Sequence, residues 1–221
     1  MWSGGKDAAL ALDVLHSQSP RRVGALLTTV VEDTDRVTMH GTPLRLIKHQ
    51  ARVLNLPLHV MRVPPRPSNE VYEARLDAVL TPLLNAGFST VVAGDLFLED
   101  VRRYREDVIE ALGARALFPL WQRDPMWLAR RFFERGYQAV ATSVDTTQLG
   151  ASFAGRAYDT SFLEALPSSV DPCGEHGAFH TFVTGGPPFE AVVPVAVSGE
   201  EAGERMHRVH LRPTDAHNPL A

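Results

Sequence analysis

The chain has 221 residues, 44% of them hydrophobic and 22% charged, which predicts one globular domain, or one domain with a small appendage, rather than a disordered chain. A formal net charge of −4 gives no basis for a long nucleic-acid surface, so we do not expect nucleic acid as a partner. The lone cysteine, Cys173, excludes an internal disulfide and suits a reducing compartment. No apolar run approaches the roughly 18 to 20 residues that span a bilayer, and Met1 and Trp2 leave no room for a signal peptide. We therefore expect a cytoplasmic protein without membrane partners.

Apolar, β-rich runs alternate with amphipathic helical patterns along the first two thirds of the chain. This order predicts an α/β fold with a doubly wound, mostly parallel, Rossmann-like sheet, because several runs are apolar throughout, as in strands covered on both faces. The predicted strands are 23–31, 58–63, 90–93, 114–120 and 139–144. The predicted helices are 6–16, 43–54, 69–86, 99–112 and 125–134, with Gly87 and Gly136 placed to end the third and the fifth.

The pattern changes after Asp145. A glycine-containing loop, a short helix at 162–165 and a strand at 191–197 predict a smaller lobe, so we expect a domain over residues 1–145 and a C-terminal lobe over 146–221. From Ser198 the chain is polar and forms either an edge hairpin or a frayed end. The apolar segment 179–183 could pair at a sheet edge, which leaves a homo-oligomer open.

A glycine-rich segment, Ser3-Gly4-Gly5-Lys6-Asp7, stands directly before the first predicted helix. The glycines let the backbone approach a phosphate, and the N–H groups at a helix start point at an anion. Lys6 adds a cation, Ser3 adds a hydroxyl, and Asp7 can orient the loop or hold Mg²⁺. These features predict a phosphate-binding loop for ATP. The alternative is a glycine turn with a capping Asp, since the spacing is neither that of Walker A nor that of a dinucleotide-binding fingerprint.

Polar residues also follow two later predicted strands. Gly94 and Asp95 come directly after the strand 90–93, at the edge where doubly wound folds place ligands, so we expect a catalytic role for Asp95 and a nucleotide contact at Gly94. His40 follows the polar loop after the strand 23–31, where such folds often reach the nucleotide. We therefore add His40 to the predicted nucleotide site.

Four charged residues on the predicted helix 99–112 are candidates for binding the second substrate. Glu99 and Asp100 open the helix, while Arg102 and Arg105 are three apart and can share a face that grips a carboxylate or a phosphate. The alternative is that the acids only cap the helix and that the arginines are solvated.

The loop around Glu175 supplies further candidates. Glu175 and His180 offer an acid and a near-neutral base, and we expect both to be catalytic. His180 can instead be a strand residue hydrogen-bonded to structure, and a metal site with Cys173 and His176 is a weaker alternative. Two glycines permit a tight turn against the substrate: Gly174 and Gly177.

Several of these segments resemble known signatures. SGGKD at 3–7 is similar to the PP-loop signature of N-type ATP pyrophosphatases, and MHG at 39–41, SNE at 68–70, GDLFLED at 94–100 and LFPLW at 117–121 extend the match in the expected order. ASFAGR at 151–156 and DPCGEHGAFHT at 171–181 look like the C-terminal signatures of the diphthine–ammonia ligase family. The resemblance covers most of the chain.

The resemblance implies a HUP-type α/β domain that carries ATP, followed by a lobe for the second substrate. Family members form an amide: a carboxylate attacks the α-phosphate of ATP, pyrophosphate leaves, and ammonia displaces AMP from the acyl adenylate. Applied to this chain, it implies a small-molecule or protein-borne carboxylate as acceptor, with Glu175 or His180 taking a proton from ammonium. ATP and Mg²⁺ are the expected cofactors.

Three features depart from the family pattern. Only Met1 and Trp2 precede the phosphate loop where the family has a full strand, so we expect either a sheet that lacks its first strand or a native start further upstream. Ala8 replaces the hydroxyl residue that ends the signature, and Ala178 replaces an acid. The alternatives are therefore a nucleotide-binding module that has lost catalysis and a tRNA-modifying PP-loop enzyme, against which the lone cysteine argues.

Overall fold

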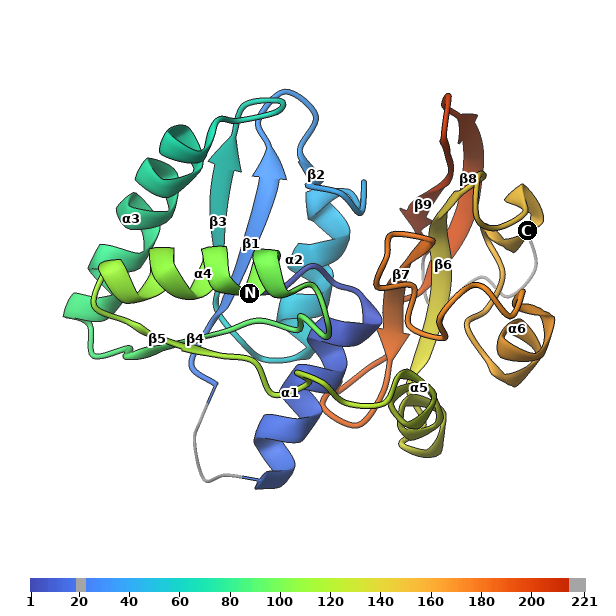
Figure 1. Cartoon of the computed structure of the whole chain (residues 1–221), viewed down its shortest axis with the longest axis horizontal. Coiled ribbons are helices and arrows are strands. Elements are labelled where there is room, and N and C mark those ends of the chain that lie inside the picture. The colour runs from blue at the N-terminus through green and yellow to red at the C-terminus, as the bar shows by residue number, and fades with distance from the viewer. Residues whose placement is uncertain (19–22, 215–221) are drawn as a thin grey trace.

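Two small parallel sheets form the centre of the first lobe (Figure 1). The computed structural model describes residues 1–18 and 23–214. β1 (Leu26–Val31) pairs in parallel with β3 (Leu58–Val63) and antiparallel with the short β2 (Arg36–Val37), while β4 (Thr90–Val92) pairs in parallel with β5 (Arg115–Leu117). The helices of this lobe are α1 (Lys6–Gln18), α2 (Leu44–Val53), α3 (Asn69–Asn85) and α4 (Glu99–Ala111). The predicted alternation of strands and helices in a parallel arrangement is confirmed here.

The two parallel sheets are not hydrogen-bonded to one another within the described residues. Met1 and Trp2 stand between them: the Trp2 N–H donates to the Leu27 carbonyl at 2.6 Å, and the Met1 amino group donates to the Val92 carbonyl. A cavity of about 800 Å³ lies at this gap, lined mostly by apolar side chains of α1, α3, β1 and β4. Two residues thus bridge β1 and β4 where the sequence predicts an incomplete first strand.

The second lobe is built on one antiparallel sheet in the order β7-β6-β9-β8 (Figure 1). Its strands are β6 (Gln138–Asp145), β7 (Phe179–Gly185), β8 (Val195–Ala202) and β9 (Met206–Pro213), and α5 (Pro125–Glu134), a 3₁₀ turn (Ala151–Phe153) and α6 (Thr160–Ala165) complete it. The prediction that 139–144 joins the parallel sheet is wrong, because β6 pairs antiparallel with β7 and β9. A buried apolar run does not reveal the direction of its partners. The strand predicted at 191–197 starts at Val195, and the polar end forms the edge hairpin β8–β9.

Side-chain caps explain several helix starts. The Ser68 hydroxyl accepts from the Val71 N–H at 3.4 Å before α3, and the Asp124 carboxylate accepts from the Trp127 N–H at 2.7 Å before α5. Asp159 does the same for α6. No helix in the described part of the chain is long and apolar enough to cross a bilayer.

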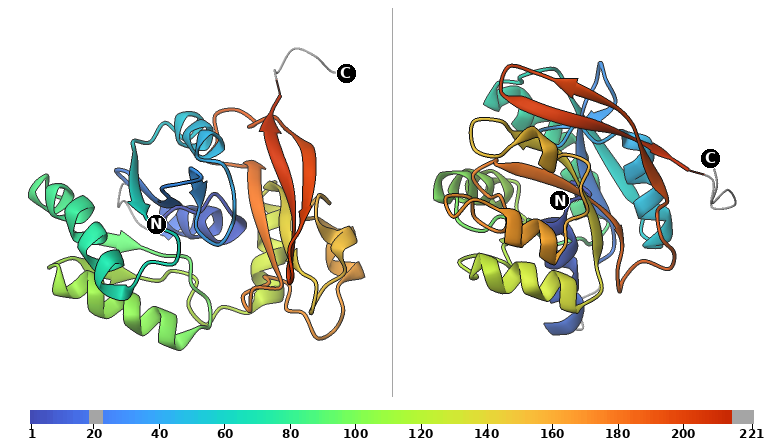
Figure 2. Two further views of the ribbon diagram at one scale, coloured as in Figure 1. Left: turned by 90° about the horizontal axis from the view of Figure 1, so that it is seen from above. Right: turned by 90° about the vertical axis from the view of Figure 1, so that its right-hand side faces the viewer.

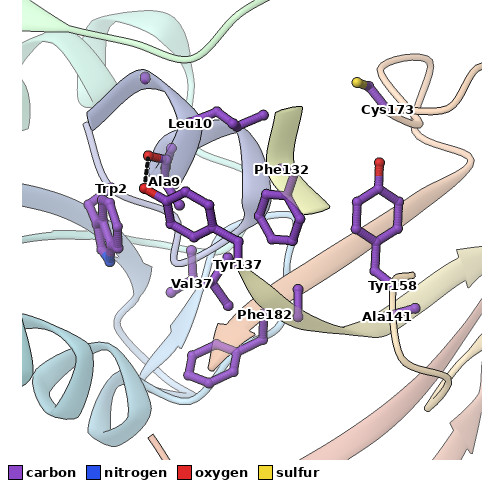
Figure 3. Close-up of a cluster of buried hydrophobic side chains, with 14 of the residues drawn as sticks. Trp2, Ala9, Leu10, Val37, Phe132, Tyr137, Ala141, Tyr158, Cys173 and Phe182 are labelled. Atoms are coloured by element: carbon purple, nitrogen blue, oxygen red, sulfur yellow. Dashed lines mark hydrogen bonds between the residues drawn. The ribbon is translucent and has the colours of Figure 1, made fainter. Parts of the chain in front are cut away.

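The hydrophobic core crosses from one lobe to the other (Figure 3). Phe132 and Phe182 of the C-terminal lobe are fully buried in the same cluster as Leu10 of α1, and the Tyr137 hydroxyl donates to the Ala9 carbonyl at 3.4 Å. Asp13 of α1, 3% exposed, pairs with two arginines of the α5 region. The helix that follows residues 3–7, the predicted phosphate loop, is therefore packed against the second lobe (Figure 2).

Candidate functional site

A cavity of about 470 Å³ lies where the phosphate loop, the ends of the parallel strands and the loop 173–175 of the second lobe meet. Ten of the residues predicted from the sequence line it. They are Ser3, Lys6, Asp7, His40, Gly94, Asp95, Arg105, Gly174, Glu175 and His180. Segments separated by more than a hundred residues in the chain thus contribute to one space.

The phosphate loop is held from the side of the second lobe. The Lys6 N–H donates to the Thr181 hydroxyl at 3.0 Å, and the Gly4 carbonyl accepts from the Val183 N–H at 2.9 Å. A Cβ on Gly5 would stand 3.1 Å from the Thr181 carbonyl oxygen and 3.2 Å from the His40 ring, closer than side chains normally approach. Gly5 therefore lets the loop lie directly against β7.

Lys6 and Asp7 form a buried ion pair at the start of α1. Lys6 Nζ lies 2.9 Å from Asp7 Oδ2 and 5.3 Å from the centre of the Phe179 ring, and the Lys6 side chain is 3% exposed. Burial opposes the charge on Lys6, but the Asp7 carboxylate, together with smaller effects of Cys173 and Glu175, outweighs it and the pKa of Lys6 is raised. Burial raises the pKa of Asp7, and the Lys6 charge only partly offsets this. Asp7 Oδ1 is buried without a hydrogen-bond partner, which suits an incoming donor or cation.

Two histidines from different lobes pack together beside the loop. The ring centres of His40 and His180 are 4.5 Å apart. Burial, then the His180 and Lys6 charges, lower the pKa of His40, while burial with the Lys6 and Arg208 charges lowers the pKa of His180 to about 4. Both imidazoles are therefore neutral at pH 7. Nδ1 of His40 is buried and lacks a hydrogen-bond partner.

Asp95 and Arg105 form the opposite wall. Arg105 Nε lies 3.4 Å from Asp95 Oδ2, and the side chains are 29% and 15% exposed. Tyr72 and Tyr104, which sequence reasoning missed, line the same wall with ring centres 6.3 Å apart. Their positions in the apolar stripes of α3 and α4 gave no signal that separates them from core residues. The wall offers a guanidinium and two aromatic rings to a ligand.

Glu175 joins the second lobe to the end of β4. Its Oε1 accepts from the Leu96 N–H at 2.9 Å and from the Phe97 N–H at 3.3 Å. Burial raises the pKa of Glu175, and the two backbone hydrogen bonds oppose that rise. Cys173 is 2% exposed, its thiol donates to the Pro125 carbonyl at 3.5 Å, and burial raises its pKa. Such a thiol is not a nucleophile at neutral pH.

Six predicted residues are not in the cavity lining. Glu99, 72% exposed, pairs with Arg103, and Asp100 is exposed at the start of α4. The Arg102 guanidinium lies 4.6 Å from the centre of the Trp121 ring, so Arg102 does not share the position of Arg105. The remaining members are glycines: Gly4, Gly5 and Gly177. Binding roles for these residues stay predictions.

The metal assignment rests on Asp7 alone. Within residues 1–18 and 23–214, no group of three or more His, Cys, Asp or Glu side chains is arranged to hold a metal ion. Cys173, His176 and His180 thus form no such cluster. A Mg²⁺ ion would have to draw on Asp7 Oδ1 together with groups of a bound nucleotide.

Comparison with known families agrees with this two-lobe site. The sequence model of the diphthamide synthase N-terminal domain matches residues 1–116, and that of the diphthamide synthase C-terminal domain matches residues 124–210. The chain belongs to the diphthamide synthase, or diphthine–ammonia ligase, family. Membership implies ATP-dependent amidation, and the family acts on protein-borne diphthine with ammonia. No curated protein matches the chain.

Proposed function

We propose that this protein is an AMP-forming amide ligase that binds Mg-ATP in the 470 Å³ cavity and activates a carboxylate by adenylation. The observation that carries the proposal is the meeting of the loop 3–7 with the loop 173–175 and His180 around one cavity. On this reading the first lobe is a HUP-type, doubly wound domain in the cytoplasm that binds the nucleotide, and the second lobe, from α5 onward, binds the acceptor.

The residues around the cavity fit a triphosphate. α1 begins at Lys6, so the positive end of the helix lies at the cavity, and Lys6 and Arg105 supply positive charge. Buried atoms without partners, such as Asp7 Oδ1 and His40 Nδ1, leave hydrogen-bonding capacity for a ligand or its cation. These groups would offset the charge that develops when a carboxylate attacks the α-phosphate and pyrophosphate leaves. Mg²⁺, held in part by Asp7, would add to that charge stabilisation.

The amidation step needs a proton acceptor. Ammonium must lose one proton to become the nucleophile, and the attacking nitrogen loses a second when the C–N bond forms and AMP leaves. His180 and Glu175 line the cavity from the same lobe, but the pKa of His180, lowered to about 4, makes it a weaker base than the sequence predicts, whereas burial raises the pKa of Glu175. We therefore assign proton acceptance first to Glu175, to His180 a hydrogen bond from the attacking ammonia, and to Asp95 the orientation of ammonium from the opposite wall.

The acceptor on this reading is a carboxylate, protein-borne diphthine in the family and a small metabolite as the alternative. A nucleotide-binding module that has lost catalysis is the competing function. Ala178 favours it, because the side chain at this position is 1% exposed beside the site and carries no acid. A tRNA-modifying enzyme finds no support in one buried cysteine.

Titration calorimetry with Mg-ATP tests the nucleotide site, comparing the native chain with Asp7→Ala. Glu99→Ala is the matched control, because Glu99 is an acid outside the cavity lining. We expect binding by the native chain and by Glu99→Ala, and at least tenfold weaker binding by Asp7→Ala. Pyrophosphate release with candidate carboxylates and ammonium then separates a ligase from a binding module. Absence of adenine-nucleotide binding by the native chain would refute the proposal.

A further inference from the structure

Gln50 is a buried amide at the junction of α2, the phosphate loop and β7. Its side chain is 0% exposed, and it is not part of the cavity lining. Nε2 donates to the Gly4 carbonyl at 3.0 Å and to the Val183 carbonyl at 2.7 Å, while Oε1 accepts from the Trp2 indole N–H at 2.9 Å. Three segments that are remote in the chain therefore meet at one side chain.

The chemistry of this junction requires a primary amide. Two carbonyls need donors and one indole N–H needs an acceptor, and Gln50 offers both from one planar group. All three partners lie in a buried environment, where a polar atom left without a partner is unfavourable. An apolar side chain of the same length would fill the space and satisfy none of them.

The backbone of the loop is fixed at Gly4 from two directions. The Gly4 carbonyl accepts from Gln50 and also from the Val183 N–H, so the loop lies against the outer edge of β7. Gly4 has φ +81, and a Cβ there would stand 2.6 Å from Ile47 Cδ1 and 2.7 Å from Gln50 Oε1. The left-handed turn of the loop is thus pressed directly against α2.

We propose that Gln50 is a positioning residue for the nucleotide, holding the Gly4 carbonyl so that the start of α1, with Lys6 and Asp7, faces the cavity. The inference rests on the proposed function, since it concerns the same ATP site. It also assigns a role to the second lobe: through Gln50 and Val183, β7 forms one side of the loop's support. Nucleotide affinity then depends on a helix residue that is outside the cavity lining.

The test compares Gln50→Met with Leu46→Val. Methionine keeps the length of the side chain and removes its hydrogen bonds, whereas Leu46 is a fully buried residue of the same helix that packs without side-chain hydrogen bonds. Calorimetry with Mg-ATP gives affinity, thermal unfolding gives stability, and hydrogen exchange follows the amides of Lys6 and Val183. We expect Gln50→Met to bind Mg-ATP at least tenfold more weakly and to exchange both amides faster, while Leu46→Val stays within twofold of the native affinity.

Trp2→Phe adds to the test, because it removes the indole donor to Gln50 Oε1 together with part of a buried ring that lines the cavity. We expect a smaller loss of affinity from this variant, about threefold, and a combined loss with Gln50→Met that is smaller than the product of the two, because both changes break the same hydrogen bond.

Native affinity and native exchange rates in Gln50→Met would overturn the inference. So would an equal loss of affinity in Leu46→Val at the same loss of stability, because the effect would then be general. If the native chain binds no nucleotide, the proposed function fails, and the exchange rates of Lys6 and Val183 alone decide whether Gln50 holds the loop.

Discussion

The two lobes are built on very different sheets, although both support the loop at residues 3–7. The parallel strands of the first lobe have three to six residues and fall into two separate sheets, with Met1 and Trp2 between them. The second lobe has one continuous antiparallel sheet whose strands have seven or eight residues. The phosphate loop belongs to the first lobe in sequence, yet Thr181 and Val183 of the second lobe hold it. The loop of the lobe with the smaller sheets is therefore held in part by hydrogen bonds from the larger sheet.

The largest expected effect comes from removing a core side chain of β7. Phe182 is 0% exposed under the strand that supports the loop, so Phe182→Ala should lower the free energy of unfolding by about 3–5 kcal/mol. Val92→Ala in β4, a partly buried position, is the matched change in the first lobe and should cost about 1 kcal/mol. Urea denaturation measures both. Equal losses would show that the two sheets contribute alike.

The buried histidines predict a pH dependence of stability. Folding lowers the pKa of His180 from 6.5 to about 4, so between these values the unfolded chain binds the proton and the folded chain does not. Stability from this residue is complete above pH 6.5 and is lost as the pH falls towards 4, by about 3 kcal/mol in all. Denaturation of the native chain and of His180→Gln at pH 7 and pH 5 tests this. The free energy of unfolding of His180→Gln should depend less steeply on pH than that of the native chain, although His40 retains part of the dependence. An unchanged slope of unfolding free energy against pH would contradict the assignment.

The ion pair between the lobes should have a more modest effect. Asp13, 3% exposed, accepts from Arg131 at 2.7 Å and from Arg135 at 2.9 Å. Asp13→Asn keeps the shape of the side chain and removes the charge, so we expect a loss of about 1–2 kcal/mol, since both arginines remain partly solvated. Asp107→Asn, an exposed acid of α4, is the control. If Asp13→Asn leaves the free energy of unfolding unchanged, apolar packing alone joins the lobes.

Among these changes, Gly94→Ala should have the smallest effect on stability, but it should clearly weaken the binding of Mg-ATP. A Cβ at Gly94 would stand 3.0 Å from the backbone carbon and oxygen of Asp7, so Gly94→Ala should push the end of β4 from the start of α1. We expect a loss of about 1 kcal/mol in stability and about tenfold in Mg-ATP affinity. Gly113→Ala, where the new Cβ meets no atom within 4 Å, tests for general backbone strain. Unchanged affinity in Gly94→Ala would contradict a nucleotide near this glycine.

Local patterns predicted most of the helices in both lobes. Caps such as Ser68 and Asp124 and the glycines after α3 and α5 set helix boundaries that the sequence already predicts. The direction of β6 was not predictable, because an apolar run looks the same beside parallel and antiparallel partners. Sheet order depends on contacts between residues far apart in the chain, and such contacts leave no local pattern.

In the site, a charged residue could be recognised from the sequence where it stands next to a glycine at a helix start or a strand end, as Lys6 and Asp95 do. Arg102 and Arg105 could not be separated by spacing alone, since the Trp121 ring under Arg102 comes from another segment. Gln50 did give a signal that was overlooked, a polar residue inside the apolar stripe of Leu46, Ile47 and Ala51. A polar position in such a stripe indicates a buried amide with partners.

The burial of Cys173 makes the only thiol of the chain a reporter of opening at the cavity. Its sulfur contacts the Pro125 carbonyl and the residue lines the cavity, so an alkylating reagent reacts with it in molecules in which this region has opened. The rate of alkylation at saturating reagent then measures the frequency of opening. A ligand that bridges the lobes slows that rate, so the alkylation of Cys173 gives a kinetic assay of ligand binding without any introduced label.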